Sequence, residues 1–244
     1  MDKKQIGFKL KTLRKEKGLS QAQLAALMGY KDHSTLAKIE TGVNDITIEN
    51  LYKLASVLEV DVSEILSIKS ELEIFNDFCK ENKLDIVLST IMPKGYEYAN
   101  GTFDVTKKTL FYNVEYLKPL PEYERIFYLF HELRHADQYL NPQKYSDEII
   151  KSSYYSIIYD GTCSKLINGE WKDCKLEGEE EYFINLYLSQ PYEVDANSYA
   201  YQKTKELFGP SKELNGLFTF WSPKKDISFA DFHKFYEEID KMIS

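Results

Sequence analysis

Long hydrophobic runs and paired cysteines are both missing from this chain of 244 residues. No apolar stretch approaches the roughly 18 residues of a membrane span, and the Lys-rich N-terminus lacks the apolar core of a signal peptide. The three cysteines (Cys79, Cys163 and Cys174) are odd in number and have no CxxC spacing. That pattern argues against a cysteine zinc site and fits a reducing compartment. We therefore expect a cytoplasmic protein with no membrane partner.

Positive charge is also scarce, since the net charge is −8, but it is concentrated at one end of the chain. Residues 1–20 carry seven Lys and Arg against only Asp2 and Glu16. Acidic residues cluster downstream, at 177–181 and 237–240. A basic head before an acidic body predicts two domains with different partners.

The N-terminal 66 residues have the periodicity of short helices. Ser20 is a good N-cap, and Gly18 and Gly29 end the first two apolar segments. The predicted helices cover 6–17, 21–28, 34–40 and 48–58, followed by a final turn at 61–66. A tight turn between the second and third helices indicates a helix-turn-helix domain. The alternative is a small helical domain that binds another protein.

Several motifs here resemble the Xre/lambda-repressor-like family, in the order in which that family has them. They are Leu19-Ser20-Gln21, Leu24-Ala25, Gly29-Tyr30, Ser34-Thr35, Lys38-Ile39-Glu40, Gly42 and Leu51-x-x-Leu54-Ala55. The resemblance implies that a homodimer binds double-stranded DNA at a two-fold operator, with a recognition helix near Ser34–Glu40. The side chains then expected at the DNA are Ser20, Gln21, Lys31, His33, Ser34, Thr35 and Lys38. The turn is one residue longer than the commonest pattern, and Asp32 would lie close to phosphate.

Histidine is rare as well, yet two of the four histidines form the motif His131-Glu132-x-x-His135. The motif lies in a helix predicted over Glu122–Leu140, where residues four apart share a face, so both imidazoles can reach one Zn²⁺ ion. Glu132 lies beside the first ligand, where its carboxylate can take a proton from a water on the metal. The pattern predicts metal-assisted hydrolysis with Glu132 as general base. The plainer interpretation is an amphipathic helix that carries two histidines.

Two histidines leave zinc short of a protein ligand, and few residues can supply it. The spacing His-x-x-Gly-x-x-His is absent, which excludes the metzincin pattern. A helix predicted from Gln190 to about Phe208 carries Glu193 as the best third ligand and Asp195 as the second choice. Asn197, one turn after Glu193, could orient a ligand histidine. Both acids could instead be charges favoured by the helix dipole.

Strands are predicted between and after these helices, with a helical connector before them. The predicted strands are 86–90, a hairpin at 96–105 around Asn100-Gly101, 109–113, and a hairpin within 153–176 around Asn168-Gly169. In the second hairpin the numbers of paired residues sum to 337, so Cys163 faces Cys174 and Leu166 faces Trp171. Two neighbouring thiols are the default there, and a disulfide is the alternative.

A second resemblance covers roughly residues 70–208. The strand, the His131–His135 helix and then Glu193-x-x-Ala196-Asn197-x-Tyr199-Ala200 resemble the ImmA/IrrE family of metallopeptidases. Tyr199 replaces that family's Phe, and the gap of 193 − 135 = 58 positions is long because it contains the second hairpin, which could shape or block the cleft. The resemblance implies zinc held by His131, His135 and Glu193. It also implies a peptide substrate paired with an edge strand made of Thr109, Leu110, Phe111, Tyr112 and Asn113.

We therefore expect an α+β protein with a lambda-repressor-like all-α domain (1–67), a helical connector (68–85) and a zincin-like metallopeptidase domain (86–244). The expected function is that of a bacterial or phage DNA-binding transcriptional regulator that cleaves a specific protein, such as a repressor, with Zn²⁺ as cofactor. The alternatives are a repressor whose second domain senses or dimerises without turnover, and the antitoxin of a toxin–antitoxin pair. His233 could contact an oxyanion, although a surface position is expected.

Overall fold

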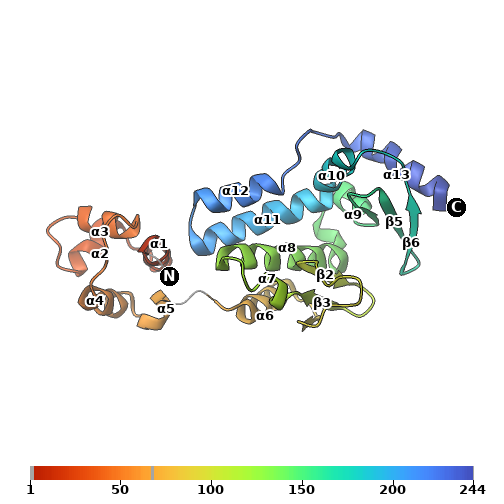
Figure 1. Ribbon diagram of the computed structural model, residues 1–244. Helices are drawn as coiled ribbons and strands as arrows, with labels where there is room; N and C mark the ends of the chain where they lie inside the picture. Colours follow the sequence, from red (N-terminus) through yellow and green to blue (C-terminus); the bar gives the residue numbers. More distant parts are fainter. Residues whose placement is uncertain (1–2, 67–68, 244) are drawn as a thin grey trace. The chain divides into compact units, whose positions relative to one another are not determined.

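The computed structural model describes residues 3–66 and 69–243, and the chain divides into two compact units (Figure 1). The first unit consists of the N-terminal 70 residues together with 205–210, and the second consists of residues 71–204 and 211–244. No helix in the described ranges is long and apolar enough to cross a membrane.

The first unit is all-helical, as predicted. Its helices are α1 (Lys3–Glu16), α2 (Gln21–Leu27), α3 (Ser34–Glu40), α4 (Ile48–Leu58) and α5 (Val62–Leu66). Ser20 begins α2 with a capping box, because its side chain accepts from Gln23 N while the Gln23 side chain accepts from Ser20 N. Fully buried leucines from four of the helices form the core: Leu10, Leu24, Leu36, Leu54 and Leu58.

A buried ion pair joins α1 to α3 inside this unit. Arg14 Nε donates to Glu40 Oε1 at 2.6 Å and Arg14 Nη2 to Glu40 Oε2 at 3.0 Å. The remaining polar atoms are also used, since Arg14 Nη1 donates to Leu19 O and Gln21 Nε2 donates to Glu40 Oε2. Such a two-pronged pair is specific in geometry, and its partners are costly to separate inside a core.

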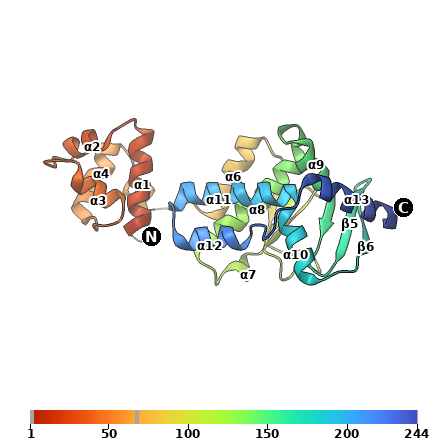
Figure 2. The same cartoon turned by 90° about the horizontal axis from the view of Figure 1, so that it is seen from above.

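The second unit is built on two long helices, α8 (Glu122–Leu140) and residues 191–204 of α11 (Pro191–Phe208), which lie side by side in Figures 1 and 2. The prediction for α8 is confirmed with the same limits, and the helix predicted from Gln190 to about Phe208 is confirmed as α11, one residue shorter at its start. The helix predicted as a connector is α6 (Glu71–Asn82), and it belongs to this unit, where Glu71 pairs with Arg125 of α8 and Phe78 packs edge-on against Tyr199 of α11. Residues 67–68 of that predicted connector lie outside the described ranges.

A small mixed sheet lies against α8, with strands β1 (Val87–Ser89), β2 (Gly101–Asp104) and β3 (Thr109–Tyr112). Its order is β1-β3-β2, with β1 parallel and β2 antiparallel to β3. The prediction that Thr109–Asn113 is an edge strand is therefore wrong, because β3 is bonded on both sides. Asn113 follows the strand as the N-cap of α7 (Val114–Leu117), and its side chain donates to the carbonyls of Glu97 and Ala99.

The predicted hairpin around Asn100-Gly101 is also wrong. Residues 96–99 form a turn region, and the hairpin that exists joins β2 to β3 through residues 105–108. Asp104 closes that turn by accepting from Lys107 N at 2.9 Å, and Lys108 takes the positive φ of 48° that a Gly or Asn usually supplies.

The 153–176 segment and the C-terminal tail form one lobe. A sheet of β4 (Tyr155–Ile157), β5 (Thr162–Ile167) and β6 (Glu170–Lys175) packs with α13 (Phe229–Ile243) around a shared apolar core. The register confirms the predicted facing pairs Leu166–Trp171 and Cys163–Cys174. Both thiols are free, and burial raises the pKa of Cys163 to about 12, which keeps it protonated.

The remaining short elements are η1 (Pro142–Lys144), α9 (Asp147–Ser152), α10 (Glu180–Ser189) and α12 (Lys212–Phe220).

We predict that Glu40→Ala destabilises the first unit by about 3–5 kcal/mol, because it leaves the Arg14 guanidinium buried without its partner. The exposed pair Lys17–Glu59, with 40% and 79% of its side chains exposed, offers the control. Lys17→Ala should cost less than about 1 kcal/mol. Amide hydrogen exchange of peptides from α1–α5 in the full chain measures the loss of stability in each variant. Equal effects of the two substitutions would contradict the structural role of the buried pair.

Candidate metal centre and DNA-binding surface

The exposed face of α3 and the turn before it carry the side chains predicted to contact DNA. Leu36, Ile39 and Glu40 are buried against the rest of the unit, so the opposite face of α3 is open to solvent. The exposed predicted residues there are Lys31, His33, Ser34, Thr35 and Lys38. Ser20 is exposed as well, at the start of α2, but the Gln21 amide is tied to the Glu40 carboxylate.

Asp32 has a structural role that explains the long turn before α3. The N-cap residue His33 makes no side-chain cap, and Asp32 Oδ1 instead accepts from Ser34 N at 2.6 Å. This hydrogen bond lowers the pKa of Asp32 and keeps its carboxylate charged beside the positive end of the helix dipole. Asp32 is therefore engaged with the backbone of α3.

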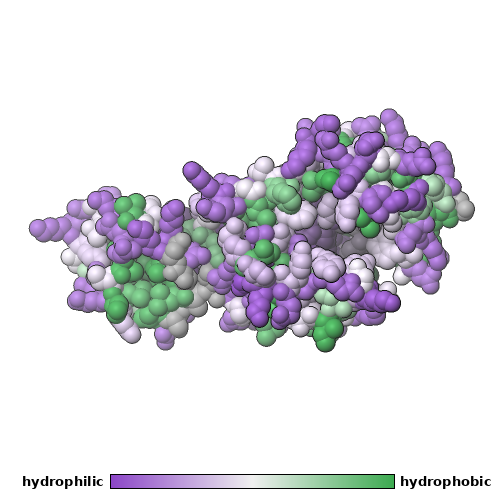
Figure 3. All heavy atoms as spheres, in the orientation of Figure 1, coloured by the Kyte–Doolittle hydropathy of each residue, from purple (hydrophilic) through white to green (hydrophobic). Residues whose placement is uncertain are grey.

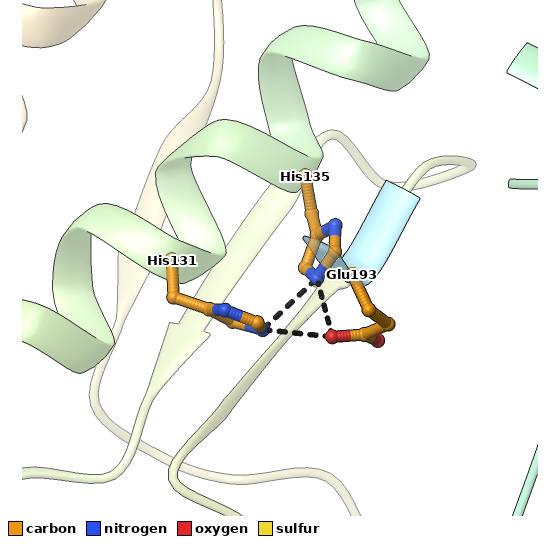
Figure 4. A group of neighbouring side chains, drawn as sticks. All are labelled: His131, His135 and Glu193. Carbon is orange, nitrogen blue, oxygen red and sulfur yellow. Dashed lines mark hydrogen bonds and ion pairs between the residues drawn. The ribbon is translucent and has the colours of Figure 1, made fainter. Parts of the chain in front are cut away.

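In the second unit, His131, His135 and Glu193 converge (Figure 4). The Nε2 atoms of the two histidines are 3.0 Å apart, and Glu193 Oε2 lies 3.4 Å from His131 Nε2 and 3.6 Å from His135 Nε2. The histidines stand one turn apart on α8, and Glu193 is in the first turn of α11. His135 is 7% exposed and Glu193 is 4% exposed, so three polar groups share one interior site.

Burial and mutual charge shift the pKa values of these groups in opposite directions. Burial, with the neighbouring His135, lowers the pKa of His131 to about 4. Burial alone would lower the pKa of His135, but the Glu193 carboxylate raises it to about 9. Burial alone would raise the pKa of Glu193, but the two imidazoles bring it below its usual value. Burial and the mutual charges thus move the pKa values of the two histidines apart and keep that of Glu193 low.

The spacing and chemistry of this cluster fit a divalent metal ion. Zinc bonds to imidazole and carboxylate are about 2.0–2.1 Å, so tetrahedral ligands stand about 3.3–3.4 Å apart. The three observed separations range from 3.0 to 3.6 Å. Glu193 Oε2 and His131 Nδ1 are also buried without a hydrogen-bond partner among the described residues. Buried polar atoms are normally satisfied, and a cation bound between the three side chains would satisfy the carboxylate oxygen.

A hydrogen-bond network behind His135 fixes its ring. His135 Nδ1 donates to Gln138 Oε1 at 2.8 Å, which leaves Nε2 as the ligand atom. The Gln138 amide donates to Tyr192 O and to Asp195 Oδ2. Asp195 is held in turn by Arg134, through contacts of 2.7 and 3.0 Å. The structure therefore places Asp195 in this supporting network and not in the cluster.

Gln138 was not identified from the sequence, although its position three residues after His135 on the same helix face is a usable signal.

Asn197 lies beside His131, and its side-chain amide donates to Trp221 O at 3.2 Å. His233 is exposed on α13 next to Glu237, which confirms the expected surface position.

A cavity of about 260 Å³ opens beside the cluster, and the face of the second unit seen in Figure 3 is hollowed there. Glu132, 9% exposed, forms part of its wall together with His131, and burial raises the pKa of Glu132 to about 7. The cavity is lined by Tyr98, Ala99, Asn100, Gly101, Tyr128, His131, Glu132, Tyr187, Asn197 and Trp221. No described residue of the 153–176 hairpin is among them, so that segment does not plug the cavity.

Gly101 permits the close approach of Glu132 to the sheet. A Cβ atom at Gly101 would lie 2.6 Å from Glu132 Cγ and 2.9 Å from Phe111 O. Any larger residue must therefore displace the Glu132 side chain or the strand. The sequence suggested a turn at this glycine, whereas the structure uses it for contact with Glu132.

Comparison with known proteins identifies the first unit only. Residues 10–65 match the helix-turn-helix family HTH_3, which covers less than a quarter of the chain. Among solved structures, the chain is similar to the crystal structure of Bacillus thuringiensis PlcR in complex with the peptide PapR7 and DNA, at 17% identity and a TM-score of 0.29, over 96% of this chain and 75% of that one. A search of curated proteins finds no match. Residues 10–65 are thus an Xre-like helix-turn-helix, the DNA-binding domain of a regulator.

We predict that DNA binding weakens steeply with salt, because each phosphate neutralised by a Lys or Arg contributes about −0.9 to the slope of log K against log salt. Lys38→Ala should reduce that slope by about 1. Lys241→Ala, an exposed lysine of α13, is the matched control and should leave the slope unchanged. Fluorescence anisotropy of labelled DNA at several salt concentrations measures this slope for each variant. Salt-independent binding would contradict the assignment of this surface.

Proposed function

We propose that this protein is a DNA-binding transcriptional regulator whose second unit is a zinc-dependent endopeptidase acting on a specific regulatory protein, such as a repressor. The observation that carries the proposal is the convergence of His131, His135 and Glu193 beside a cavity walled by Glu132. Three protein ligands leave one position of a tetrahedral zinc ion open to water, and a general base beside that position serves chemistry, whereas a purely structural ion requires neither.

Three atoms would hold the ion: His131 Nε2, His135 Nε2 and Glu193 Oε2. Zinc bound by three protein ligands supplies a Lewis acid that polarises a carbonyl and activates water. The hydrogen bond from His135 Nδ1 to Gln138 keeps the His135 ring in the orientation and tautomer that a ligand needs.

Glu132 would move the proton. Its carboxylate lies in the cavity wall next to His131, so it can accept a proton from the attacking water and then donate it to the leaving amine. Tyr187 of α10 lines the same cavity, and its pKa is raised by burial and by the carboxylates of Glu193 and Glu132. Its side chain also makes a hydrogen bond with Glu193, so the protonated hydroxyl helps to position that carboxylate as a ligand.

The substrate would pair with β2 instead of the predicted strand. Strand β2 pairs with β3 on one side, and within the described sheet its other side has no neighbouring strand. An extended peptide can add there by main-chain hydrogen bonds. Because Gly101 of β2 lies against Glu132, such a peptide would pass in front of the general base.

We predict that Glu132→Ala retains zinc but loses cleavage by about 10²–10⁴-fold, because it removes only the proton carrier. His131→Ala should lose both zinc and cleavage, because it removes a ligand. His233→Ala is the matched control and should keep both, since His233 is exposed on α13. Zinc content by mass spectrometry and hydrolysis of a fluorescence-quenched peptide library measure the two properties.

An unchanged regulatory output of Glu132→Ala in cells would contradict the peptidase proposal. That result would favour the second reading of the same site, in which the bound ion serves sensing or dimerisation without turnover. Zinc lost from Glu132→Ala but kept in His131→Ala would contradict the ligand assignment.

We also predict that Gly101→Ala keeps zinc but lowers cleavage by about 10²-fold, because a misplacement of the base by about 1 Å has an effect of that size. Gly216→Ala is the control, since a Cβ atom there meets nothing within 4 Å. The same two assays apply. Full activity of Gly101→Ala would show that Glu132 does not need its position against β2.

A further inference from the structure

The cavity beside Glu132 has the size of a subsite. Sites for whole small-molecule ligands usually occupy about 300–1,000 Å³. This cavity encloses about 260 Å³, and it begins at the first residue of β2, Gly101. Its dimensions and position suit one side chain of a peptide that runs along the strand.

Four of the ten residues that line the cavity carry a phenol or indole ring: Tyr98, Tyr128, Tyr187 and Trp221. Tyr128 and Trp221 meet edge to face, with ring centroids 6.0 Å apart at 89°. Trp221 Nε1 donates to Tyr128 OH at 3.3 Å, and Tyr128 OH donates to Glu124 Oε1. The polar atoms of Tyr128 and Trp221 are therefore engaged, so these two residues offer their ring surfaces to a guest.

The charges around the cavity disfavour an ionised guest. Glu132 is the one acidic lining residue in the described structure, and no Lys or Arg lines the cavity there. An acidic side chain would face the Glu132 carboxylate, and no lining Lys or Arg of the described structure would pair with it. A basic side chain would pair with Glu132 and occupy the group that the peptidase needs for proton transfer. An uncharged side chain has neither conflict.

Tyr98 extends the aromatic surface to the cavity mouth. Its side chain is 83% exposed and leans edge-on against Tyr116, with ring centroids 6.3 Å apart. The loop that carries it is fixed, because Asn113 donates to the carbonyls of Glu97 and Ala99 on either side of Tyr98. An exposed ring on an anchored backbone can cover an entering aromatic side chain without reordering of the loop.

We propose that this cavity binds one uncharged aromatic side chain of an extended peptide whose backbone pairs with β2. The inference rests on the proposed peptidase function, and it names the class of residue that the substrate presents beside the cleaved bond. The rings of Tyr128, Trp221 and Tyr98 enclose that side chain.

Trp221 provides a direct reporter of occupancy. The chain has two tryptophans, and Trp171 lies in β6, so full-length protein carrying Trp171→Phe retains Trp221 alone. Five capped hexapeptides that differ at one central position (Phe, Leu, Lys, Glu or Gly) are titrated against it by fluorescence. Mass spectrometry of each peptide after titration reports cleavage.

The Phe peptide should bind at least about tenfold more tightly than the Gly, Lys and Glu peptides, since burial of such a side chain is worth about 1.5–3 kcal/mol. Tyr98→Ala should remove most of that preference and Tyr98→Phe should keep it. Tyr159→Ala, an exposed tyrosine outside the cavity, is the matched control. Equal binding of the five peptides, tightest binding of the Lys peptide, or no Trp221 response up to millimolar peptide would each overturn the inference.

The two readouts separate this inference from the proposed function. Selective binding of the Phe peptide without cleavage of any peptide would support the aromatic subsite and contradict the peptidase. Cleavage that ignores the central residue would support the peptidase and overturn the aromatic subsite.

Discussion

The second unit depends on the burial of two imidazoles and a carboxylate within a few ångströms of one another. Removing such groups from water is costly unless each finds a partner. The protein provides some of the compensation itself, because Gln138 accepts from His135 and is anchored by Asp195 and Arg134. What remains unpaired, Glu193 Oε2, points at the two histidines. We propose that a metal ion bound between the three side chains compensates this carboxylate oxygen.

The buried ion pair of the first unit differs from this cluster, because its polar atoms are satisfied by neighbouring residues. Arg14 and Glu40 are as deeply buried as the cluster, yet Leu19 O and Gln21 complete their hydrogen bonds. A closed network of that kind holds helices together and needs no ligand. Incomplete satisfaction at a cavity, with pKa values moved apart, is instead typical of functional sites. The same physical rule therefore distinguishes the structural pair from the candidate metal centre.

Local patterns were sufficient to predict the elements that carry the site. Helical spacing predicted α8 with its limits and α11 to within a residue. Glu193 was a candidate because two histidines leave zinc short of a protein ligand. The Asn168-Gly169 turn predicted the register that faces Cys163 with Cys174. These features depend on residues close in sequence, or on a chemical requirement that few residues can meet.

Pairing between distant segments could not be predicted in the same way. The parallel contact of β1 with β3 makes β3 central, and no local signal reveals it. Asn100-Gly101 looked like a hairpin turn, but Gly101 is required by the approach of Glu132, whereas the real turn uses Asp104 and Lys108. The aromatic cavity combines Tyr98, Tyr187 and Trp221 from three separate parts of the chain. Tertiary packing alone brings them together.

X-ray absorption at the zinc edge, on full-length protein loaded with one equivalent of zinc, tests the central claim most directly. Our account predicts a first shell of nitrogen and oxygen at about 2.0–2.1 Å, with the outer-shell scattering of two imidazoles. Substitution of Glu193 by Ala should remove one of the oxygen ligands. Sulfur at about 2.3 Å, or failure of the protein to retain zinc through desalting, would contradict a metal centre formed by His131, His135 and Glu193.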